Sequence, residues 1–485
     1  MGWTLTVEDF GRIERAEIDV RPLMLFVGDN NSGKSYLASL LWGVVAMQMD
    51  VELRASPGYA ACLSWVAERI GPGKPPLDHV LSAEETRMFA GLFEDAFARG
   101  AGAMVERIFN APTPKARSLA LEVSTFGPVR FTWSADAAQD KHALSVVDSP
   151  TRDLQTVRRG AHEEIQALAV DMLARRISFG RLTRLFSPFS DTFQTIDPIY
   201  MPASRTGFML LYKAAVRASM QRELRGAQGG GALSDLTTPA FHFLDMLVQG
   251  LREVPVTKLK GAKFAEEAEM LEQAIGGRIE ILSEGPGIQE YRYRMAGAGD
   301  ALTMSRSSSL VTEVAPIVLV LRHLESFPFL ILEEPEAHLH PRLQRVLARV
   351  IARLINKGVY VWITTHSTTF CQQINNLVKL GAMPEDRAVA ARVKWGYGDN
   401  EALKLDDVAG YQLVVKEETG RTEVTELRKT ERGLVMPSFN RELVRLGQRW
   451  TISIAPGQAA SAGRRARRAA RRRCVLHGVP GRQAE

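Results

Sequence analysis

The sequence has few cysteines and no long apolar run. Its 485 residues hold three cysteines, Cys62, Cys371 and Cys474, which are too far apart for a metal-binding pattern. Three are also too few for a disulfide framework, which predicts a reducing, cytoplasmic compartment. The longest apolar runs, near 39–47 and 316–321, fall well short of the ~18 residues that a membrane-spanning helix needs. We therefore expect no membrane association.

The sequence also lacks internal repeats and sustained heptads, so a long coiled coil is excluded. Hydrophobic residues make up 45% and charged residues 24%, which excludes disorder and collagen-like structure for the bulk of the chain. At ~150 residues per domain, the length corresponds to about three domains.

Excess charge of one sign is confined to the end of the chain. The formal net charge is +6, but residues 463–485 carry eight arginines and one acid, and the rest has 53 basic and 54 acidic residues. This low-complexity tail cannot bury enough apolar surface to fold alone. Two interpretations stay open, a contact with nucleic-acid phosphates and a solvated tail.

A phosphate-binding loop follows the first strongly apolar strand, residues 23–27. The sequence GDNNSGKS at 28–35 fits G-x-x-x-x-G-K-[ST], and a helical pattern follows it. Its glycines let backbone N–H groups point at phosphates, the lysine adds a positive charge, and the last serine offers a hydroxyl to Mg²⁺. The residues expected to bind ATP are Gly28, Asn30, Asn31, Ser32, Gly33, Lys34 and Ser35, with Lys34 also counted as catalytic.

Two acids end a second apolar strand, residues 329–332. Glu333 is expected near the Mg²⁺ shell and Glu334 is expected to activate the attacking water, which is the Walker B arrangement. A pair of surface acids opening a turn is the alternative. The usual first acid is aspartate, and Glu333 is one methylene longer, which leaves direct metal contact open. His366 follows a third apolar strand, 359–363, and is expected to contact the γ-phosphate.

Two further clusters have weaker assignments. His338 and His340 could suggest zinc, but their spacing with Glu336 is short, and a loop that contacts a second subunit fits better. Ser307, Ser308 and Ser309 precede an expected helix at 310–325. The first alternative is that Ser308 binds ATP, and the second is that Ser309 is a helix N-cap.

Other elements follow from periodicity. We expect a hairpin over 3–20, a helix over 152–176, a strand at 199–201 and strands near 388–395, 411–416 and 422–428.

Taken in order, GDNNSGKS, SSSLVTEVAPIVLVLR, LILEEPEAHLHPRLQ and ITTHS resemble the ABC-type ATPases of the SMC/RecF and overcoming-lysogenization-defect (OLD) group, above all the standalone ATPases of prokaryotic antiphage defence systems. The resemblance covers about residues 3–50, 198–210 and 300–380, and within it residues 200–205 resemble a segment that lies near the nucleotide in these ATPases. It implies an α/β P-loop NTPase fold, an ABC-type head with a mixed sheet flanked by helices. It also implies a head-to-tail homodimer around ATP, with a signature motif near Ser308. The LSGGQ glycines of that motif are absent.

Lys34 and Glu334 are 300 residues apart, so a large helical and β insertion must split the head. The predicted segments are an N-terminal half (1–52), an inserted lobe (53–196), a segment returning to the head (197–300), a C-terminal half (301–385), a β-rich extension (386–456) and a disordered tail (457–485).

The function predicted from these motifs is an ATP-hydrolysing conformational switch that controls DNA or a separate effector such as a nuclease. One alternative is an OLD-like nuclease, which the scattered acids after His366 do not favour. Another is a transporter ATPase, which the missing glycines and the large insertion do not favour.

Overall fold

The computed structural model describes residues 2–47, 50–123, 127–136, 141–149, 152–159, 161–179, 198–224, 236–250, 262–282, 289–297, 299–324 and 327–437. Residues 1–434 form one compact unit, which contains every helix and strand of the described chain. The predicted Arg-rich tail at 457–485 lies outside the described residues. Among the described helices, none is long and apolar enough to cross a membrane.

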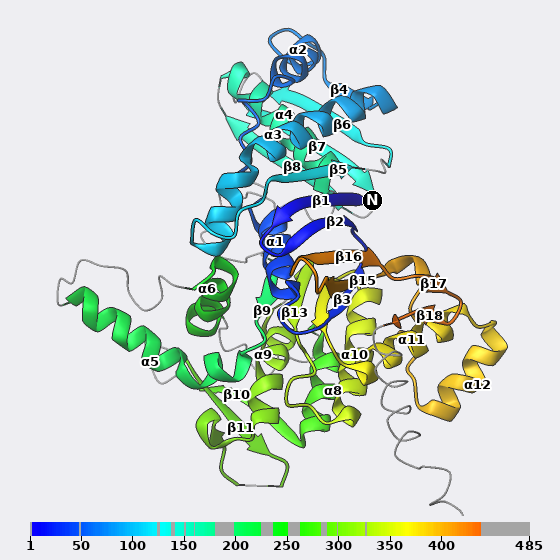
Figure 1. Cartoon of the computed structure of the whole chain (residues 1–485). Coiled ribbons are helices and arrows are strands. Elements are labelled where there is room, and N and C mark those ends of the chain that lie inside the picture. Colours follow the sequence, from blue (N-terminus) through cyan, green and yellow to red (C-terminus); the bar gives the residue numbers. More distant parts are fainter. Residues whose placement is uncertain are drawn as a thin grey trace, which may run out of the picture. The chain divides into compact units, whose positions relative to one another are not determined.

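A nine-stranded mixed sheet forms the centre of this unit (Figure 1). Its strands, in spatial order, are β5 (Ser118–Val123), β1 (Trp3–Phe10), β2 (Ile13–Asp19), β16 (Thr422–Glu426), β15 (Val408–Val415), β3 (Leu23–Gly28), β14 (Tyr360–Thr365), β13 (Phe329–Glu333) and β9 (Ile199–Met201). The hairpin predicted over 3–20 and the strand predicted at 199–201 are confirmed.

Strands β15, β3, β14, β13 and β9 run parallel to one another. Every residue of β3 and β13 is buried, as expected for parallel strands covered on both faces. Parallel strands bring their carboxyl ends to one edge of the sheet. The phosphate loop, the two glutamates and His366 each follow one of these strands, so this edge carries the candidate site.

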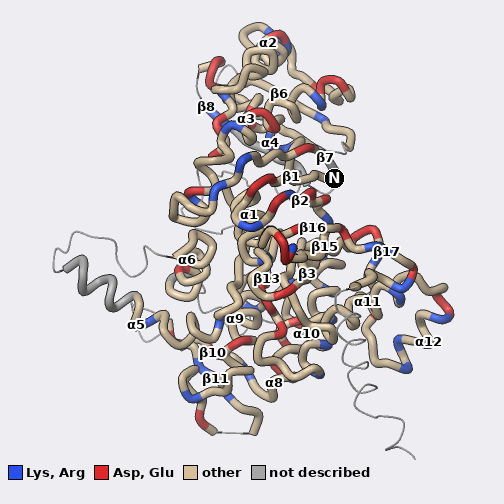
Figure 2. The backbone as a smooth tube through the Cα atoms, in the orientation of Figure 1, with Lys and Arg blue, Asp and Glu red and all other residues tan. Residues whose placement is uncertain are grey.

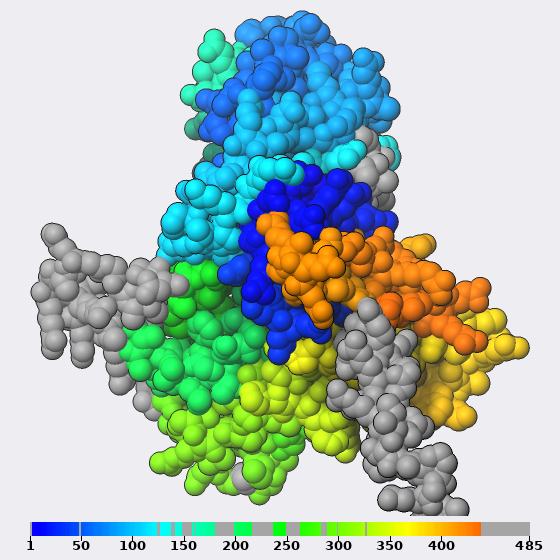
Figure 3. Space-filling model, in the orientation of Figure 1, coloured from blue at the N-terminus to red at the C-terminus, as the bar shows by residue number. Residues whose placement is uncertain are grey.

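The strands predicted near 411–416 and 422–428 exist, but they lie within the main sheet. Strand β15 pairs with β3 from Val408 opposite Leu23 to Leu413 opposite Gly28, and β16 pairs with both β15 and β2. Figure 3 shows the corresponding orange atoms against the dark-blue N-terminal atoms. Residues 386–456, predicted as an extension, therefore supply two strands to the sheet that holds the phosphate loop.

Between β3 and β9, the chain forms a second sheet with its own helices. This antiparallel sheet has the order β4 (Leu77–Val80), β6 (Arg130–Asp136), β7 (Lys141–Ser149) and β8 (Arg152–Arg159). Its helices are α2 (Tyr59–Arg69), α3 (Ala83–Phe109) and α4 (His162–Phe179). The helix predicted over 152–176 is therefore wrong in its first half, because residues 152–159 pair with β7 and helix begins only at His162. The boundaries predicted for the inserted lobe, 53–196, stay a prediction.

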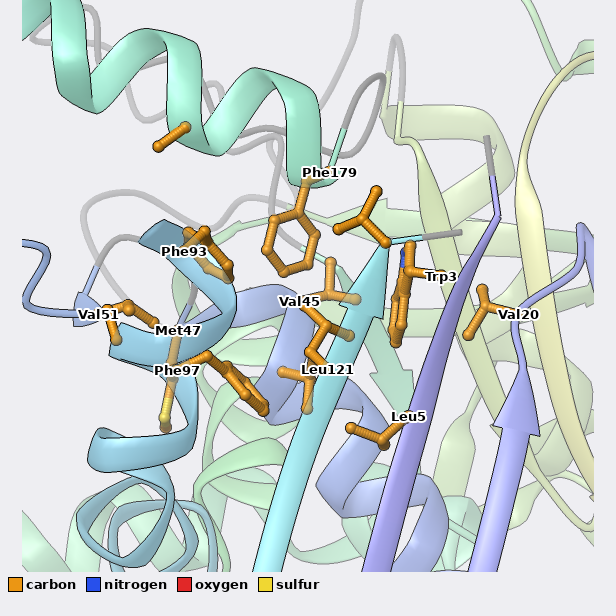
Figure 4. Packing of buried hydrophobic residues seen from close by; sticks show 14 of the residues in the cluster. Trp3, Leu5, Val20, Val45, Met47, Val51, Phe93, Phe97, Leu121 and Phe179 are labelled. Carbon is orange, nitrogen blue, oxygen red and sulfur yellow. The ribbon is translucent and has the colours of Figure 1, made fainter. Parts of the chain in front are cut away.

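The core runs without a break from the main sheet into this lobe. Figure 4 shows Trp3 of β1 beside Phe179 of α4, with Phe93 and Phe97 of α3 next to them. The ring centroids of Trp3 and Phe179 are 5.9 Å apart, and those of Phe93 and Phe179 are 5.2 Å apart. Aromatic pairs at such distances bury large apolar areas. The lobe helices thus pack against the main sheet through its N-terminal strand.

The remaining helices surround the parallel strands or extend from them. They are α1 (Lys34–Ala46), α5 (Arg205–Leu224), α6 (Thr238–Asp245), a π-helix (Met246–Gly250), α8 (Ala265–Ile275), α9 (Ser309–His323), α10 (Pro341–Asn356), α11 (Thr368–Ala382) and α12 (Glu385–Trp395). Short 3-10 turns occur at 304–306 and 405–407, and the small sheets comprise β10 (Gly277–Leu282), β11 (Glu290–Met295), β12 (Leu302–Thr303), β17 (Lys429–Thr430) and β18 (Gly433–Leu434). Helix α1 packs on β3, β13 and β14, and α9 packs on α5 and α8.

The strand predicted near 388–395 is wrong, because these residues belong to helix α12. Glu385 and Asp386 occupy its first turn, where acids favour the helix dipole, and Gly396 ends it in the left-handed conformation. The valines that suggest a strand, Val389 and Val393, are exposed on the helix surface. In this segment the acids of the first turn and the glycine after the last turn favour a helix more strongly than the valines favour a strand.

Candidate functional site at the carboxyl edge of the parallel strands

The phosphate loop passes from β3 to α1 through three residues with positive φ. Gly28 has φ 153°, Asn31 has φ 60° and Gly33 has φ 96°. A Cβ on Gly28 would lie 2.3 Å from the carbonyl oxygen of Leu413 in β15. Glycine is therefore required at position 28 by close backbone packing as well as by its dihedral angle.

Lys34 is the first residue of α1, and its buried ammonium lies inside the loop. Its Nζ donates to the carbonyl oxygens of Gly28, at 2.8 Å, and Asp29, at 2.7 Å. Burial lowers the pKa of Lys34, while the charges of Glu334 and Asp29 oppose this effect. The hydroxyl of Ser32 is also buried, and it has no hydrogen-bond partner among the described residues. Asn30 and Asn31 are exposed. A phosphate oxygen would supply acceptors for these donors.

Glu333 ends β13 as a buried carboxylate and reaches the phosphate loop. Its Oε2 accepts a hydrogen bond from Ser35 Oγ at 3.1 Å, and its Oε1 accepts one from the Tyr200 hydroxyl. Burial raises the pKa of Glu333, and the charge of Glu334 adds to this. The predicted pair of Mg²⁺-associated residues, Ser35 and Glu333, is thus brought together by folding across 298 residues.

Tyr200 in β9 belongs to the segment that the family resemblance puts near the nucleotide, but the sequence predicts no individual role for it. Its hydroxyl lies 3.0 Å from Ser39 Oγ of α1 and also contacts Glu333. Burial, followed by the charge of Glu333, raises the pKa of Tyr200 well above its usual value. The signal in the sequence is its place within a short apolar strand, although a tyrosine there does not predict a carboxylate partner.

Glu334 adopts a backbone conformation that is rare for a residue with a side chain. Its φ is 41°, a conformation that costs of the order of 1–3 kcal/mol when it is held by surrounding structure. Its N–H donates to the carbonyl oxygen of Thr364 at 2.8 Å, and its own carbonyl oxygen accepts from Arg205 at 3.2 Å. Its side chain remains partly exposed, as an activating base must be if it is to reach water.

His366 lies beside two acids at the end of β14. Its Nδ1 is 3.8 Å from Glu334 Oε1 and 3.6 Å from Glu336 Oε1, and its side chain is half exposed. The structure therefore places predicted residues Lys34, Ser35, Glu333, Glu334 and His366 at the ends of three neighbouring strands.

Glu336 is a second site residue that sequence reasoning missed. Its buried Oε1 accepts from Thr365 Oγ1 at 2.7 Å and from the N–H groups of His366 and Ser367 at 2.8 and 3.1 Å. These bonds fix the turn that carries His366. Its place two residues after Glu334 and beside His338 suggests a metal ligand, and no local pattern indicates a positioning role.

The two loop histidines do not form a metal site with Glu336. His340 Nδ1 accepts from the N–H of Arg342 at 3.2 Å, so this side chain caps α10. His338 is a turn residue with φ 57°. Across the ranges that the structure describes, no group of three or more histidines, cysteines or acids is placed to hold a metal ion.

The serine cluster opens helix α9, with a one-residue difference from the prediction. Ser308 is the N-cap, and its Oγ accepts from the N–H of Val311 at 3.4 Å, whereas Ser309 is the first helical residue. The predicted cap at Ser309 is therefore wrong. Ser308 is exposed at a helix N-terminus, and its predicted contact with ATP stays a prediction.

Comparison with known proteins supports an ATPase domain. A family model described as "AAA ATPase domain" matches residues 255–371, a span that contains Ser308, Glu333, Glu334 and His366. Residues 255–371 are therefore similar to an ATPase domain of this type, and the chain has a mixed α/β P-loop NTPase fold with additional small sheets. No curated protein matches the chain.

Three solved SMC head structures show a weaker similarity. The SmcHead bound to the C-winged helix domain of ScpA has 14% identity and a TM-score of 0.34, over 87% of this chain and 96% of that one. The SMC head domain from Thermotoga maritima has 10% identity and a TM-score of 0.28, over 88% of this chain and 99% of that one. The third is the Smc head domain with an extended coiled coil bound to the C-terminal domain of ScpA, derived from Pyrococcus furiosus. It has 13% identity and a TM-score of 0.33, over 92% of this chain and 98% of that one. Because these TM-scores are low, the fold assignment depends on the strand order and the matched domain.

Proposed function

We propose that this protein binds and hydrolyses ATP and uses the cycle as a conformational switch. The observation that carries the proposal is the convergence of Lys34, Ser35 and Glu333 with Glu334 and His366 at one edge of the sheet. Segments from opposite halves of the chain thus supply phosphate-binding donors and a candidate base to one place. The matched ATPase domain supports the same assignment.

The residues present fit a Mg²⁺ ion accompanying the nucleotide. Ser35 and Glu333 share a hydrogen bond and offer the oxygen ligands that Mg²⁺ prefers. They would hold the ion directly or through water, and Tyr200 fixes the other carboxylate oxygen. When bound, Mg²⁺ neutralises charge that develops on the phosphate oxygens.

The protein groups divide the remaining work between binding and hydrolysis. Lys34 exchanges its two carbonyl partners for phosphate oxygens, and the loop N–H groups point at the same charge. Glu334 orients an attacking water and accepts its proton. His366, held by Glu336 through backbone hydrogen bonds, contacts the γ-phosphate.

We further propose that two copies close head to tail around the nucleotide. The exposed Ser308 at the N-terminus of α9 is the group we expect to reach ATP bound by the partner. The output we propose is control of DNA or of a separate effector such as a nuclease, in the antiphage setting that the sequence resemblance implies. Figure 2 shows acidic and basic residues interspersed along the described chain, so any contact with DNA would depend on local groups.

The decisive experiment compares wild type with Glu334→Gln, and with Glu418→Gln as a control at an exposed turn position. We expect wild type and the control to hydrolyse ATP. Glu334→Gln should lower kcat by about 100-fold or more, the usual contribution of a general base. The Kd of Glu334→Gln for ATP should stay within about 3-fold of the wild-type value. Light scattering should detect dimers of this variant accumulating when ATP is present.

An equal kcat in Glu334→Gln and wild type would remove Glu334 from the proposed role. Absence of ATP turnover by wild type, alone and with duplex DNA added, would contradict the ATPase proposal. If ATP binds but every species stays monomeric, the proposed dimer is wrong and the nucleotide site stands.

A further inference from the structure

A fully buried arginine lies beneath the Walker B acids. Arg205 is the first residue of α5, and its side chain has no exposed area. Its NH1 donates to the carbonyl oxygens of Glu333, at 2.6 Å, and Pro202, at 3.1 Å, and its NH2 donates to that of Glu334 at 3.2 Å. One guanidinium thus binds the backbone of both acids, Glu333, predicted near Mg²⁺, and Glu334, predicted to activate water.

The charge of Arg205 is matched by Glu313 in the second turn of α9. Arg205 NH2 lies 3.0 Å from Glu313 Oε2, and this carboxylate is as buried as its partner. A buried charge requires such a partner and further hydrogen bonds. Two neighbours strengthen the link between the helices, because the N–H of Thr206 donates to Glu313 Oε1 at 3.2 Å and the hydroxyls of Thr206 and Thr312 are 2.9 Å apart.

Arg205 therefore connects two parts of the site that hydrolysis must coordinate. On one side is α9, whose N-terminus carries Ser308. On the other is Glu334, whose positive φ is held at its N–H by Thr364 and at its carbonyl oxygen by two donors, the N–H of Ala337 at 3.0 Å and Arg205 at 3.2 Å. A residue in a sparsely populated conformation depends on such contacts from both sides.

We propose that Arg205 is a positioning residue that transmits the position of α9 to Glu334. This inference rests on the proposed ATPase function. Movement of α9, when Ser308 engages nucleotide, shifts Glu313 and Arg205 and so the carbonyl oxygen of Glu334. The carboxylate of Glu334 then takes the orientation that hydrolysis requires. Arg205 does not touch the reacting atoms.

The arginine fork is suited to this role, and lysine is not. Arginine presents five N–H donors in a rigid plane and can bind several acceptors in fixed directions, whereas lysine is a flexible point charge. Arg205→Lys keeps the charge that pairs with Glu313 but cannot hold both the carboxylate and the two glutamate carbonyls in one geometry. Glu313→Gln keeps the shape and an acceptor for Thr206 but removes the charge.

The test measures ATP affinity and kcat separately in Arg205→Lys and Glu313→Gln. The matched control is Arg175→Lys in α4, since Arg175 is also buried, pairs with Asp171 at 2.9 Å and donates to the carbonyl oxygen of Val51 at 3.0 Å. Each protein is purified as the folded species, and turnover is expressed per ATP-binding site. We expect kcat to fall at least 10-fold in both site variants, with ATP Kd within about 3-fold of wild type. The control should lose thermal stability without a change in kcat.

The double variant distinguishes transmission from two independent defects. If Arg205 and Glu313 act as one unit, Arg205→Lys/Glu313→Gln should be no slower than the slower single variant. A kcat like that of the Arg175→Lys control would overturn the proposal, as would equal losses in ATP binding and kcat, which indicate a structural role. If Arg205→Lys cannot be purified in a folded form, Glu313→Gln alone tests the proposal, again by a fall in kcat without a matching loss of ATP affinity. Wild type without ATPase activity would instead refute the proposed function.

Discussion

The two loops that meet at the site accommodate unusual backbone conformations in different ways. The phosphate loop uses glycine at Gly28 and Gly33, where φ is 153° and 96°, and at Asn31, where φ is 60°, it uses asparagine, which adopts the left-handed conformation more readily than most residues. The Walker B loop places an ordinary residue, Glu334, at φ 41° and holds it through Ala337 of the same loop and through the distant Thr364 and Arg205. The first solution is local, since a residue without a Cβ meets little penalty there. The second combines that local bond with contacts from β14 and α5, which lie far away in the sequence.

This difference has a functional consequence under the proposed mechanism. A glycine-based loop keeps its shape whatever the surrounding helices do, which suits a site that must bind phosphate at any stage of the cycle. A loop held by distant partners changes when they move, which suits a base that must act only after closure. The phosphate loop should therefore respond to local changes, and Glu334 should respond to changes elsewhere.

The largest expected effect is the loss of ATP binding in Lys34→Ala. The ammonium donates two hydrogen bonds within the loop, and bonds from a charged donor contribute about 1.5–3 kcal/mol each. Two such bonds to phosphate correspond to a rise in Kd of roughly 100- to 10,000-fold. Equilibrium titration with ATP checks this, with Lys404→Ala, on the chain after α12, as the control. Undiminished affinity in Lys34→Ala would refute the phosphate-loop assignment.

A smaller effect, on stability, is expected from adding a single methyl group at Gly28. In Gly28→Ala the new Cβ would approach the Leu413 carbonyl oxygen to 2.3 Å, so backbone must shift. Overpacking and strain of this kind cost about 2–3 kcal/mol in the free energy of unfolding. Gly358→Ala is the matched control, because Gly358 also has positive φ, 84°, but nothing lies within 4 Å of the added Cβ. Urea denaturation measures the free energy of unfolding of both variants. Equal losses of stability in Gly28→Ala and Gly358→Ala would show that close packing of Gly28 against β15 is unimportant.

The residues of the site that could be predicted are those whose signal is contiguous in the sequence. GDNNSGKS, Glu333 with Glu334, and His366 each follow an apolar strand, and the parallel arrangement then brings them to one edge. The P-loop NTPase fold could be predicted for the same reason. The contacts of Arg205 and Glu336 could not, although the family resemblance puts Arg205 near the nucleotide, because an arginine in a helix and an acid in a turn acquire their roles only through partners distant in the chain.

The fold shows the same limit. Strand β15 has an apolar pattern, but nothing in that pattern says that Val408 pairs with Leu23 across most of the chain. The sequence therefore predicts the strand correctly and its location incorrectly. Loop closure on this scale is a property of the whole chain, whereas periodicity reports only local structure.

The most direct test of the strain at Glu334 compares two variants that both lack the carboxylate. An L-residue in the left-handed conformation costs about 1–2 kcal/mol relative to glycine, and the greater freedom of glycine in the unfolded chain offsets about half of this. Glu334→Gly should therefore exceed Glu334→Ala in free energy of unfolding by about 0.5–1 kcal/mol, as measured by urea denaturation without nucleotide.

The same pair of substitutions at Glu418 provides the control. The φ of Glu418 is not positive, so alanine should there be more stable than glycine by a similar amount, and the sign of the difference should reverse. If alanine equals or exceeds glycine at position 334 as well, the loop holds no strain for Thr364 and Arg205 to maintain. The contrast between a loop shaped by glycine and a loop shaped by distant partners would then fail, and with it the reason to expect Glu334 to respond to α9.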